Sequence, residues 1–290
     1  MGSLIEVKNL KKYFGKVKAV DDISLSVEKG EIFGFLGPNG AGKTTTIRCM
    51  MDFIRPTEGS VSILGLDAQK SSVDLKKKIG YLSGNLRLYE KWTGRDHIDF
   101  VRKLNGKKDI ADKIAEKFGF DPEKKVKSLS SGNKQKLGII MAFMTDPEIL
   151  IMDEPTNALD PLLQNTMYEL IEESAKNGTT VFMSSHNLSE VDRVCHKVGI
   201  IKDGKMVATE SIRNLKEKRL YTVTAYFSDG FDKDEFKMEG VGITKEIPGG
   251  LLLSAKGDIN NLVAKLSAHK IKDLQIEHAS LEDIFLEFYE

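Results

Sequence analysis

Short apolar runs alternate with segments of helical periodicity over the first 210 residues, which is the pattern of an α/β protein. Six runs are predicted to be strands: Leu4–Val7, Ile32–Leu36, Ile149–Met152, Val181–Ser184, Val198–Ile201 and Met206–Ala208. The run Ile149–Met152 is apolar at every position, as expected for a strand buried on both faces. A helix is predicted between Leu162 and Ala175, because Asp160 and Pro161 precede it at cap and first-turn positions and Gly178 follows it.

The pattern changes between about residues 86 and 145, where no convincing strand is visible. Apolar residues at helical spacing predict two amphipathic helices, one marked by Ile98, Val101 and Leu104 and the next by Ile110, Ile114 and Phe118. We interpret this stretch as a helical insertion in the α/β core.

A second change follows at about Ser211. Tyr221–Phe227 alternates as a half-buried strand does, a turn at Pro248-Gly249-Gly250 precedes a strand at Leu251–Ser254, and a helix is predicted from Asp258 to His269. The last residues place Leu281, Ile284, Phe285 and Phe288 at helical spacing. The sequence thus predicts an α/β domain over residues 1–210, with a helical subdomain at about 86–145, and a small α+β domain over 211–290.

Composition narrows the class of protein but does not indicate a reaction or a ligand. The 43 basic and 43 acidic side chains balance, which argues against a large nucleic-acid-binding surface. The longest apolar run, Ile139–Met144, is six residues, whereas about 20 are needed to span a bilayer. No secretory leader pattern is visible, and the two cysteines, Cys49 and Cys195, fit packed residues in a reducing compartment better than ligands or nucleophiles. We therefore expect a cytoplasmic protein.

A phosphate-binding loop is the strongest motif. Residues 37–44 fit GxxxxGK(S/T), the Walker A pattern, between the apolar run Ile32–Leu36 and a helix that begins near Thr45. Glycines let the backbone N–H groups turn toward phosphate oxygens, Lys43 supplies a cation for the β- and γ-phosphates, and Thr44 can ligate Mg²⁺. The expected nucleotide-binding residues are Gly37, Pro38, Asn39, Gly40, Ala41, Gly42, Lys43, Thr44 and Thr45.

An acid pair follows the apolar run Ile149–Met152. Asp153 and Glu154 would lie at the C-terminal edge of a parallel sheet, where such sheets bind ligands. Asp153 is suited to hold Mg²⁺ through water, and Glu154 is suited to accept a proton from an attacking water. Alone, the pair fits a helix cap or a solvated loop as well, but with the phosphate loop it is the expected partner.

A serine- and glycine-rich turn, Leu129-Ser130-Ser131-Gly132-Asn133, opens a helix between these two motifs. The turn is followed by Asp153-Glu154-Pro155, by Asn157-Ala158-Leu159-Asp160 and by Ser185-His186. With the phosphate loop these are five motifs, and the match covers residues 4 to about 210. Their order resembles that of the ATPase subunit of an ATP-binding cassette (ABC) transporter. The resemblance implies a P-loop NTPase core with an antiparallel β subdomain and a helical insertion, and ATP and Mg²⁺ as ligands.

The resemblance also implies roles at matching positions. Ser130, Ser131 and Gly132 look like the signature that contacts the γ-phosphate bound to the opposite subunit, and Asp160 looks like the loop aspartate that crosses the dimer interface. His186 resembles the switch histidine that contacts the γ-phosphate and the attacking water, whereas His97, His196, His269 and His278 are expected to be structural.

The family stacks adenine on an aromatic ring just upstream of the core. Phe14, directly before Gly15, fits the spacing better than Tyr13, and either residue fits ordinary strand packing as well.

Two departures from the family pattern are visible. The signature, usually LSGGQ, is Leu-Ser-Ser-Gly-Asn here, but Ser130 and Gly132 are kept. The loop after Ile79–Leu82 normally carries a glutamine, and Gly84 stands at the aligned position. Gly84 has no side chain to reach Mg²⁺ or water, so Asn85 or a water would have to fill the gap. We predict a slower or more weakly coupled ATPase.

The resemblance further implies partners. Two ATPase subunits, identical or different, would pair head to tail on ATP, and a membrane permease would hold them at the inner face of the membrane. A groove near Asn85, Leu86, Tyr89 and Trp92 would receive a permease helix, although Tyr89 and Trp92 fit core packing equally well. The basic run Lys124-Lys125-Val126-Lys127 fits a solvated loop better than a contact with permease or lipid.

The chain's ending, Ala279-Ser280-Leu281-Glu282-Asp283-Ile284-Phe285-Leu286, resembles the C-terminal extension of exporter-type ATPases of drug-resistance and sodium-export systems. Two alternatives remain open at this point. One is a soluble ABC protein of DNA repair or translation, although the chain has one cassette and no heptad run. The other is a weakly catalytic, nucleotide-dependent regulatory subunit.

Overall fold

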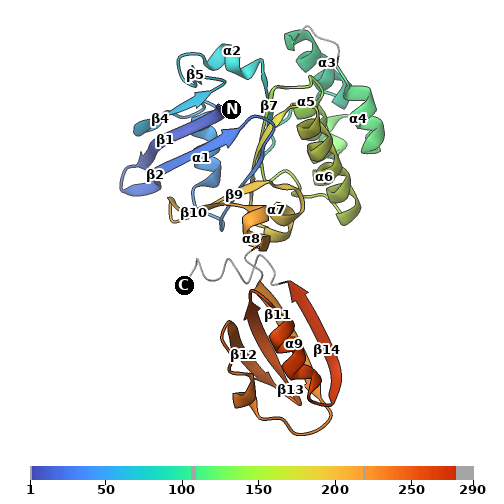
Figure 1. Ribbon diagram of the computed structural model, residues 1–290. Helices are drawn as coiled ribbons and strands as arrows, with labels where there is room; N and C mark the ends of the chain where they lie inside the picture. The colour runs from blue at the N-terminus through green and yellow to red at the C-terminus, as the bar shows by residue number, and fades with distance from the viewer. Residues whose placement is uncertain (1, 106–108, 218–219, 279–290) are drawn as a thin grey trace. The chain divides into compact units, whose positions relative to one another are not determined.

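The computed structural model describes residues 2–105, 109–217 and 220–278. They fall into two compact units divided after Thr209, the first with two sheets and the second with one, and each has its own core (Figure 1). The predicted helix over 280–290 lies outside the described residues.

A six-stranded sheet lies at the centre of the first unit, with the strand order β10-β9-β3-β8-β7-β6. Its strands are β3 (Ile32–Leu36), β6 (Ile79–Leu82), β7 (Ile149–Asp153), β8 (Thr180–Ser185), β9 (Lys197–Lys202) and β10 (Lys205–Ser211). The pairs β3–β8, β3–β9, β7–β8 and β6–β7 are parallel. In these ladders Leu36 lies opposite Ser185 and Asp153 opposite Ser184. Three strands therefore deliver their C-terminal residues to one edge of the sheet.

An antiparallel sheet with the order β2-β1-β4-β5 packs beside the central sheet. Its strands are β1 (Ser3–Phe14), β2 (Val17–Glu28), β4 (Glu58–Ile63) and β5 (Leu66–Asp67). Ile5, Val7 and Leu25 share one core with Phe35 and Ile151 of the central sheet. Only the start of β1 was among the predicted strands, because register shifts along β1 interrupt the two-residue alternation that marks a strand.

Helices cover the rest of the first unit. They are α1 (Lys43–Met50), α2 (Ser72–Lys76), α3 (Gly94–Asn105), α4 (Ala111–Lys117), the 3₁₀ helix η1 (Val126–Ser128), α5 (Ser131–Phe143), α6 (Pro161–Lys176) and α7 (Leu188–Val194). The predicted helical insertion corresponds to α3, α4 and α5. Ile98 is buried as its apolar spacing indicated, but Leu104 on the same helix is 67% exposed.

The second unit begins with α8 (Ile212–Glu217) and contains an antiparallel sheet in the order β12-β13-β11-β14. Its further elements are β11 (Leu220–Phe227), the 3₁₀ helix η2 (Lys233–Phe236), β12 (Val241–Ile247), β13 (Gly250–Lys256), α9 (Asn260–Ser267) and β14 (Ile271–His278). Val223 and Leu253 from the sheet share a core with Leu262 and Leu266 of α9. Strands β12 and β14 are too polar on their exposed faces to have been predicted from apolar runs.

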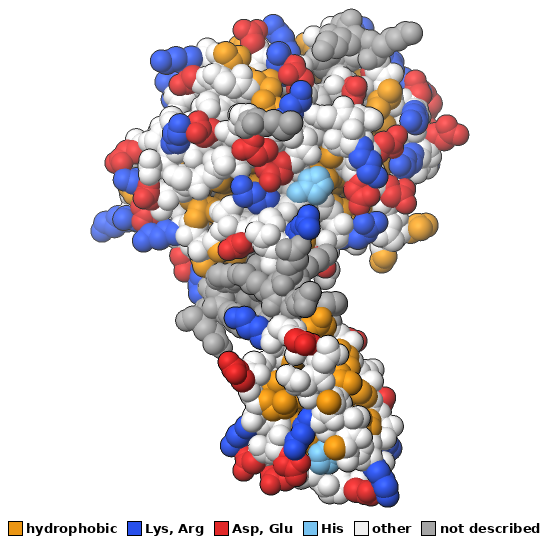
Figure 2. All heavy atoms as spheres, viewed as in Figure 1, with side chains coloured by type: hydrophobic (Ala, Val, Ile, Leu, Met, Phe, Trp, Pro, Cys, Tyr) orange, Lys and Arg blue, Asp and Glu red, His pale blue; other side chains and the backbone are white. Residues whose placement is uncertain are grey.

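The charges on the surface and the burial of the two cysteines agree with what the composition predicted. On the face shown in Figure 2, charged side chains of both signs are interspersed over the first unit. Within the described residues, no helix is both long and apolar enough to cross a membrane. Cys49 and Cys195 are buried free thiols. Burial raises the pKa of Cys49 to about 11 and that of Cys195 well above its ordinary value, so neither is a ready nucleophile.

The aromatic packing of the central sheet generates a stability prediction. The Phe182 ring lies 5.7 Å from that of Phe33 and 5.5 Å from that of Phe35, and its side chain is fully buried. Phe182→Ala should lower the free energy of unfolding by about 3–5 kcal/mol, since it leaves a cavity between packed strands. Val73→Ala on the exposed face of α2 should change it by less than about 0.5 kcal/mol. Equal urea midpoints for the two variants would contradict this account of the core.

Candidate functional site

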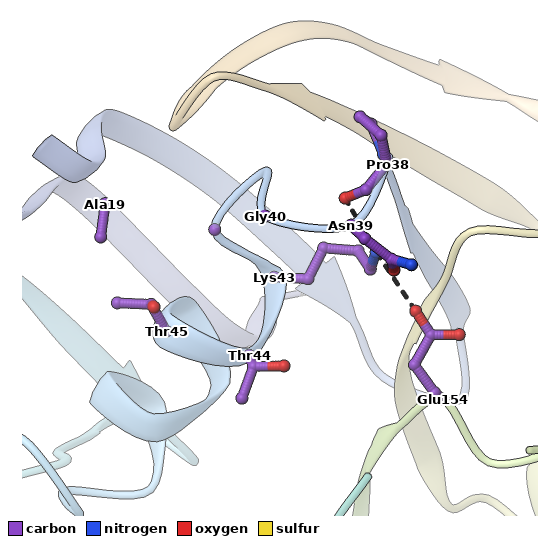
Figure 3. A pocket seen from close by; sticks show the side chains of 9 residues that line it. Ala19, Pro38, Asn39, Gly40, Lys43, Thr44, Thr45 and Glu154 are labelled. Atoms are coloured by element: carbon purple, nitrogen blue, oxygen red, sulfur yellow. Dashed lines mark hydrogen bonds and ion pairs between the residues drawn. The ribbon is translucent and has the colours of Figure 1, made fainter.

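The phosphate loop connects β3 to α1 and is held from several sides (Figure 3). The N–H of Gly37 donates to the Ser185 carbonyl at 3.2 Å, which ties the loop to the end of β8. Lys43 is 6% exposed, and its Nζ donates to the carbonyls of Gly37 (2.6 Å) and Pro38 (3.2 Å). Gly42, at the N-terminus of α1, has φ 108°, and a Cβ there would lie 2.4 Å from the Ala19 carbonyl oxygen. This position therefore requires glycine.

Asp153 lies at the end of β7, where the next strand fixes its carboxylate. The Thr44 hydroxyl donates to Oδ2 at 2.8 Å, and the Ser184 hydroxyl donates to Oδ1 at 2.6 Å. Asp153 is buried, so these two bonds set its orientation. Carboxylate and hydroxyl oxygens are the hard donors that Mg²⁺ takes in phosphate sites, and Thr44 and Asp153 place such donors side by side.

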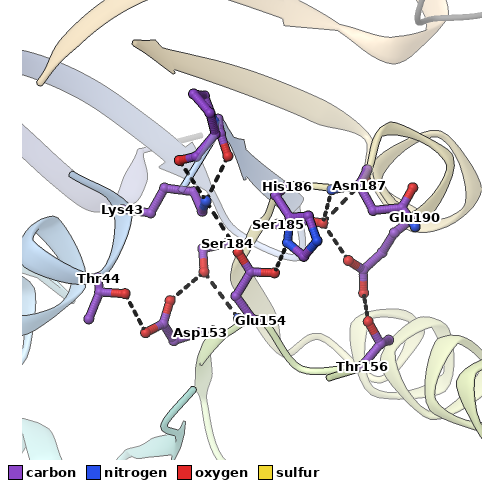
Figure 4. Close-up of polar contacts among 12 residues, drawn as sticks. Lys43, Thr44, Asp153, Glu154, Thr156, Ser184, Ser185, His186, Asn187 and Glu190 are labelled. Atoms are coloured by element: carbon purple, nitrogen blue, oxygen red, sulfur yellow. Dashed lines mark hydrogen bonds and ion pairs between the residues drawn. The ribbon is translucent and has the colours of Figure 1, made fainter. Parts of the chain in front are cut away.

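Glu154 occupies the centre of the site (Figure 4). Its backbone has φ 51°, in the left-handed region that is rare for residues other than glycine, and its N–H donates to Ser184 Oγ at 3.1 Å. The turn directs its carboxylate between two cationic or proton-carrying groups: Oε1 lies 3.2 Å from Lys43 Nζ, and Oε2 lies 2.6 Å from His186 Nδ1. An acid, a base and an ammonium group thus converge at the phosphate loop.

These groups face a pocket of about 200 Å³ that is lined by Ala19, Pro38, Asn39, Gly40, Gly42, Lys43, Thr44, Thr45 and Glu154. Ligand pockets for drug-sized molecules begin at roughly 300 Å³, so this one matches a phosphate chain better than a whole nucleotide. Except for Ala19, each of these residues was among those predicted from the sequence. Gly37 and Ala41, also predicted, are buried behind the lining.

The two candidate adenine-stacking residues lie outside that lining. The Tyr13 hydroxyl donates to Asp21 Oδ1 at 2.5 Å, which raises the pKa of Tyr13 and lowers that of Asp21. Phe14 is half exposed, and Lys12 Nζ lies 5.0 Å from its ring centroid. Phe14 thus has a ring available to a ligand, whereas Tyr13 is engaged in a hydrogen bond within the protein.

The signature turn and the loop aspartate are helix caps on the surface. Ser130 caps α5 by accepting from the Asn133 N–H at 3.3 Å, and Asp160 caps α6 by accepting from the Leu163 N–H at 3.0 Å. A Cβ on Gly132 would lie 3.0 Å from the Ala158 carbonyl oxygen, so the turn and the loop are close neighbours. Ser130, Ser131 and Asp160 are exposed and do not line the pocket of their own chain.

The other histidines have contacts that fit structural roles. His97 is buried, contacts the Thr93 carbonyl through Nδ1 at 2.8 Å and accepts from the Tyr89 N–H through Nε2 at 3.1 Å. His196 accepts from the Ile32 N–H at 3.1 Å, and His269 packs against Phe236 with the ring centroids 5.3 Å apart. The side chain of His278 lies outside the described residues.

Sequence reasoning missed the residues behind the site. The Ser184 hydroxyl donates to the Asp153 carboxylate and accepts from the Glu154 backbone N–H, and Glu190 on α7 accepts hydrogen bonds from Ser185 and Thr156. Two consecutive serines at the end of an apolar run are a signal that could have indicated Ser184 and Ser185. Nothing in the local pattern distinguishes Glu190 from Asp192, the other acidic residue of α7.

Gly84, at the position where the family pattern carries a glutamine, lies close to Asp153. A Cβ on Gly84 would lie 3.0 Å from the Asp153 carbonyl oxygen and 3.1 Å from Asp153 Oδ2. Asn85 is exposed, and its N–H donates to Ser83 Oγ at 3.3 Å. Space for a side chain at residue 84 therefore exists only if Asp153 or the loop moves by a few tenths of an ångström.

This geometry is that of a nucleotide-binding ATPase fold, with a phosphate loop after β3 and an acid pair after β7 on either side of the parallel strand β8. Residues 20–157 match the ABC transporter family. The bacitracin transport ATP-binding protein BcrA of Bacillus licheniformis is 34% identical over 99% of this chain and 97% of its own length. BcrA of Enterococcus faecalis is 38% identical over 77% of this chain and 74% of its own length.

Among solved structures, an ATP-binding subunit of an ABC transporter superposes with a TM-score of 0.69 at 26% identity, covering 74% of this chain and 92% of that one. The chain belongs to the family of ABC transporter ATP-binding proteins. It is an ATP-binding, ATP-hydrolysing subunit of that family, and the α/β P-loop fold expected from its motifs is confirmed.

The close approach at Gly84 makes the missing glutamine testable. Gly84→Gln restores an amide near Asp153 and should raise ATP turnover severalfold or tighten its coupling to transport. Gly84→Ala is the matched control, because it adds the Cβ that crowds Asp153 without the amide, and it should lower turnover. Phosphate release measured with and without a transport partner checks both. Gly84→Gln with turnover and coupling equal to those of the wild type would contradict the prediction.

Proposed function

We propose that this chain is the ATPase subunit of an exporter, working as a dimer on a separate membrane permease. The observation that carries the proposal is the convergence of Lys43, Glu154 and His186 at the phosphate loop. The transport names of the two BcrA relatives and the exporter-type ending of the sequence support the choice of an exporter.

ATP binding begins at the phosphate loop in this proposal. The β- and γ-phosphates take the place of Glu154 as the partner of Lys43, and the backbone N–H groups of the loop bind their oxygens. Thr44 and Asp153 fit Mg²⁺ as oxygen donors, and the ion would neutralise charge on the β- and γ-phosphates. Phe14, half exposed, is the candidate to stack on adenine.

Hydrolysis then uses the acid at the centre of the site. Glu154, released from Lys43, accepts a proton from the water that attacks the γ-phosphate, and the bond from the phosphorus to the bridging oxygen breaks to leave ADP and phosphate. His186 contacts Glu154 through Nδ1, and it is placed to orient the γ-phosphate and the water. Each of these roles depends on the short distances among three side chains from three loops.

The exposed caps support a dimer. Ser130–Gly132 and Asp160 do not line the pocket of their own chain, although the turn and the loop that precedes Asp160 lie next to one another and carry hydroxyl, N–H and carboxylate groups. A second subunit packed head to tail would bring them to the γ-phosphate of its partner and complete both sites, so ATP would join the subunits and hydrolysis would release them.

The dimer proposal is tested at Glu154, the proposed general base. Glu154→Gln keeps the shape of the side chain but cannot accept a proton, so turnover should fall at least about 100-fold while ATP still binds. The variant should accumulate as an ATP-bound dimer on size-exclusion chromatography with light scattering. Glu148→Gln, at a surface ion pair with Lys78, is the control and should behave as the wild type. An ATP-bound Glu154→Gln protein that stays monomeric would contradict the proposal.

An aromatic patch on the helical insertion supports the permease contact. Tyr89 is 64% exposed and its ring centroid lies 4.7 Å from that of Trp92, which also packs against Phe100 at 5.7 Å. The basic run lies alongside, because the N–H groups of Val126 and Lys127 donate to the carbonyls of Trp92 and Glu90. Apolar rings bordered by exposed lysines form a surface suited to a membrane subunit and anionic headgroups.

Co-purification with a multi-span membrane protein tests this contact. Tyr89→Ala should reduce recovery of the membrane protein and leave ATP turnover of the isolated subunit unchanged, because the patch is separate from the phosphate site. Val17→Ala, an exposed apolar residue on β2, is the control and should change neither. Full recovery with both Tyr89→Ala and Trp92→Ala would contradict docking at this patch.

One observation favours a second candidate function, a nucleotide-dependent regulatory subunit with little catalysis. Gly84 carries no side chain where the family places a glutamine. Phosphate release by the purified wild type decides between the two functions, since sustained turnover that stops in Glu154→Gln supports the transport ATPase.

A further inference from the structure

A carboxyl group lies behind the catalytic site, on α7, where it contacts neither the phosphate loop nor the pocket lining. Glu190 is 2% exposed, and each of its two oxygens accepts a hydrogen bond from a hydroxyl group of a different element. Thr156 Oγ1 lies 2.8 Å from Oε1, and Ser185 Oγ lies 2.5 Å from Oε2. Glu190 therefore bridges the loop that follows β7 and the last residue of β8 (Figure 4).

Burying a carboxyl group costs free energy unless its oxygens accept hydrogen bonds, so Glu190 does more than fill space. Burial raises the pKa of Glu190 above its ordinary value, and the bonds from Ser185 and Thr156 offset part of that effect. Tyr168 packs in the same region, and burial raises its pKa to about 12. An apolar side chain of similar size would fill this space without the desolvation cost.

The Ser185 branch leads to the catalytic groups. Ser185 precedes His186, whose Nδ1 contacts Glu154, and the Ser185 carbonyl accepts from the Gly37 N–H at the start of the phosphate loop. The Ser185 hydroxyl also accepts from the Asn187 N–H at 2.9 Å, which shapes the turn on the far side of His186. Fixing Ser185 thus fixes the backbone on both sides of the histidine.

The Thr156 branch leads to the surface loop. The Thr156 carbonyl accepts from the Leu159 N–H at 3.1 Å, and Leu159 directly precedes Asp160. One residue earlier, the Pro155 carbonyl accepts from Gln135 of α5 at 2.8 Å, which connects this loop to the helix that begins at the signature turn. The bond to Glu190 holds the middle of a loop whose two ends carry Glu154 and Asp160.

We propose that Glu190 is a positioning residue for hydrolysis: through Ser185 and Thr156 it holds His186 and the 154–160 loop in one fixed geometry. The inference rests on the proposed catalytic roles of Glu154 and His186. Glu190 is not among the residues that line the phosphate pocket. It acts by keeping His186 within reach of Glu154 while the other loop meets the partner subunit, so a change on one loop is transmitted to the other.

Two substitutions separate positioning from mere folding. Glu190→Leu removes both bridges, and it should lower kcat about 10- to 100-fold, since small displacements of positioned groups cost that much, while ADP affinity stays within about twofold. ADP tests the phosphate loop without the γ-phosphate. Glu190→Gln can still accept from Thr156 and can donate to Ser185 Oγ, so it should keep kcat within about threefold of the wild type. Ser189→Ala, exposed on the same helix, is the control.

Non-additivity is the readout that a purely structural role would not produce. If Glu190 acts through His186, then His186→Ala should cost little more in the Glu190→Leu background than Glu190→Leu alone. Losses that multiply would overturn the proposal, as would Glu190→Leu with kcat within about twofold of the wild type. Should Glu190→Leu fail to fold, Ser185→Ala removes the bridge that leads to His186 and should lower kcat, again non-additively with His186→Ala.

The experiments distinguish failure of the positioning role of Glu190 from failure of the proposed catalysis. A wild type that releases no phosphate overturns both the proposed catalysis and the positioning role. A wild type that hydrolyses ATP, together with an active Glu190→Leu variant that unfolds at the same temperature, overturns the positioning role alone.

Discussion

The parallel register of three neighbouring strands is the constraint on which the site depends. Because β3, β7 and β8 end at the same edge of the sheet, the phosphate loop, the acid pair and the loop that carries His186 lie side by side. The pairing of Asp153 with Ser184 brings a hydroxyl beside the carboxylate, and the pairing of Leu36 with Ser185 brings the loop carrying His186 next to Gly37. A shift of one residue in either ladder would separate groups that now lie within hydrogen-bond distance.

The buried core makes this register stable. The facing strands are apolar on both sides, and the stacked rings of Phe33 and Phe182 interlock β3 with β8. The polar side chains at the ends of β7 and β8 are the exceptions, and each is bonded to a neighbour: Ser184 to Asp153, Ser185 to Glu190, and Asp153 also to Thr44 in the first turn of α1. Rigid packing below and a connected polar network above together fix catalytic groups from separate loops.

Much of this could be predicted from the sequence, for reasons visible in particular residues. The strand Ile149–Asp153 is apolar throughout, and the phosphate loop carries its glycines at positions that only a tight turn explains, so both could be placed without coordinates. Strand β1 could be placed only at its start, because its irregular register with β2 disrupts alternation, and β2 and β4 were not predicted at all. Glu190 could not be found, since its burial is decided by the packing of α7 rather than by the order of residues along it.

The ion pair between Lys43 and Glu154 has a consequence for how the site is switched on. In the mechanism that we propose, Glu154 is paired with the same ammonium group, that of Lys43, that the phosphates would bind. The phosphates of the nucleotide would therefore compete with the Glu154 carboxylate for Lys43, and Glu154 would be released only when they bind. In this proposal the substrate itself creates the reactive state, because Glu154 stays paired with Lys43 until a phosphate is there to be attacked.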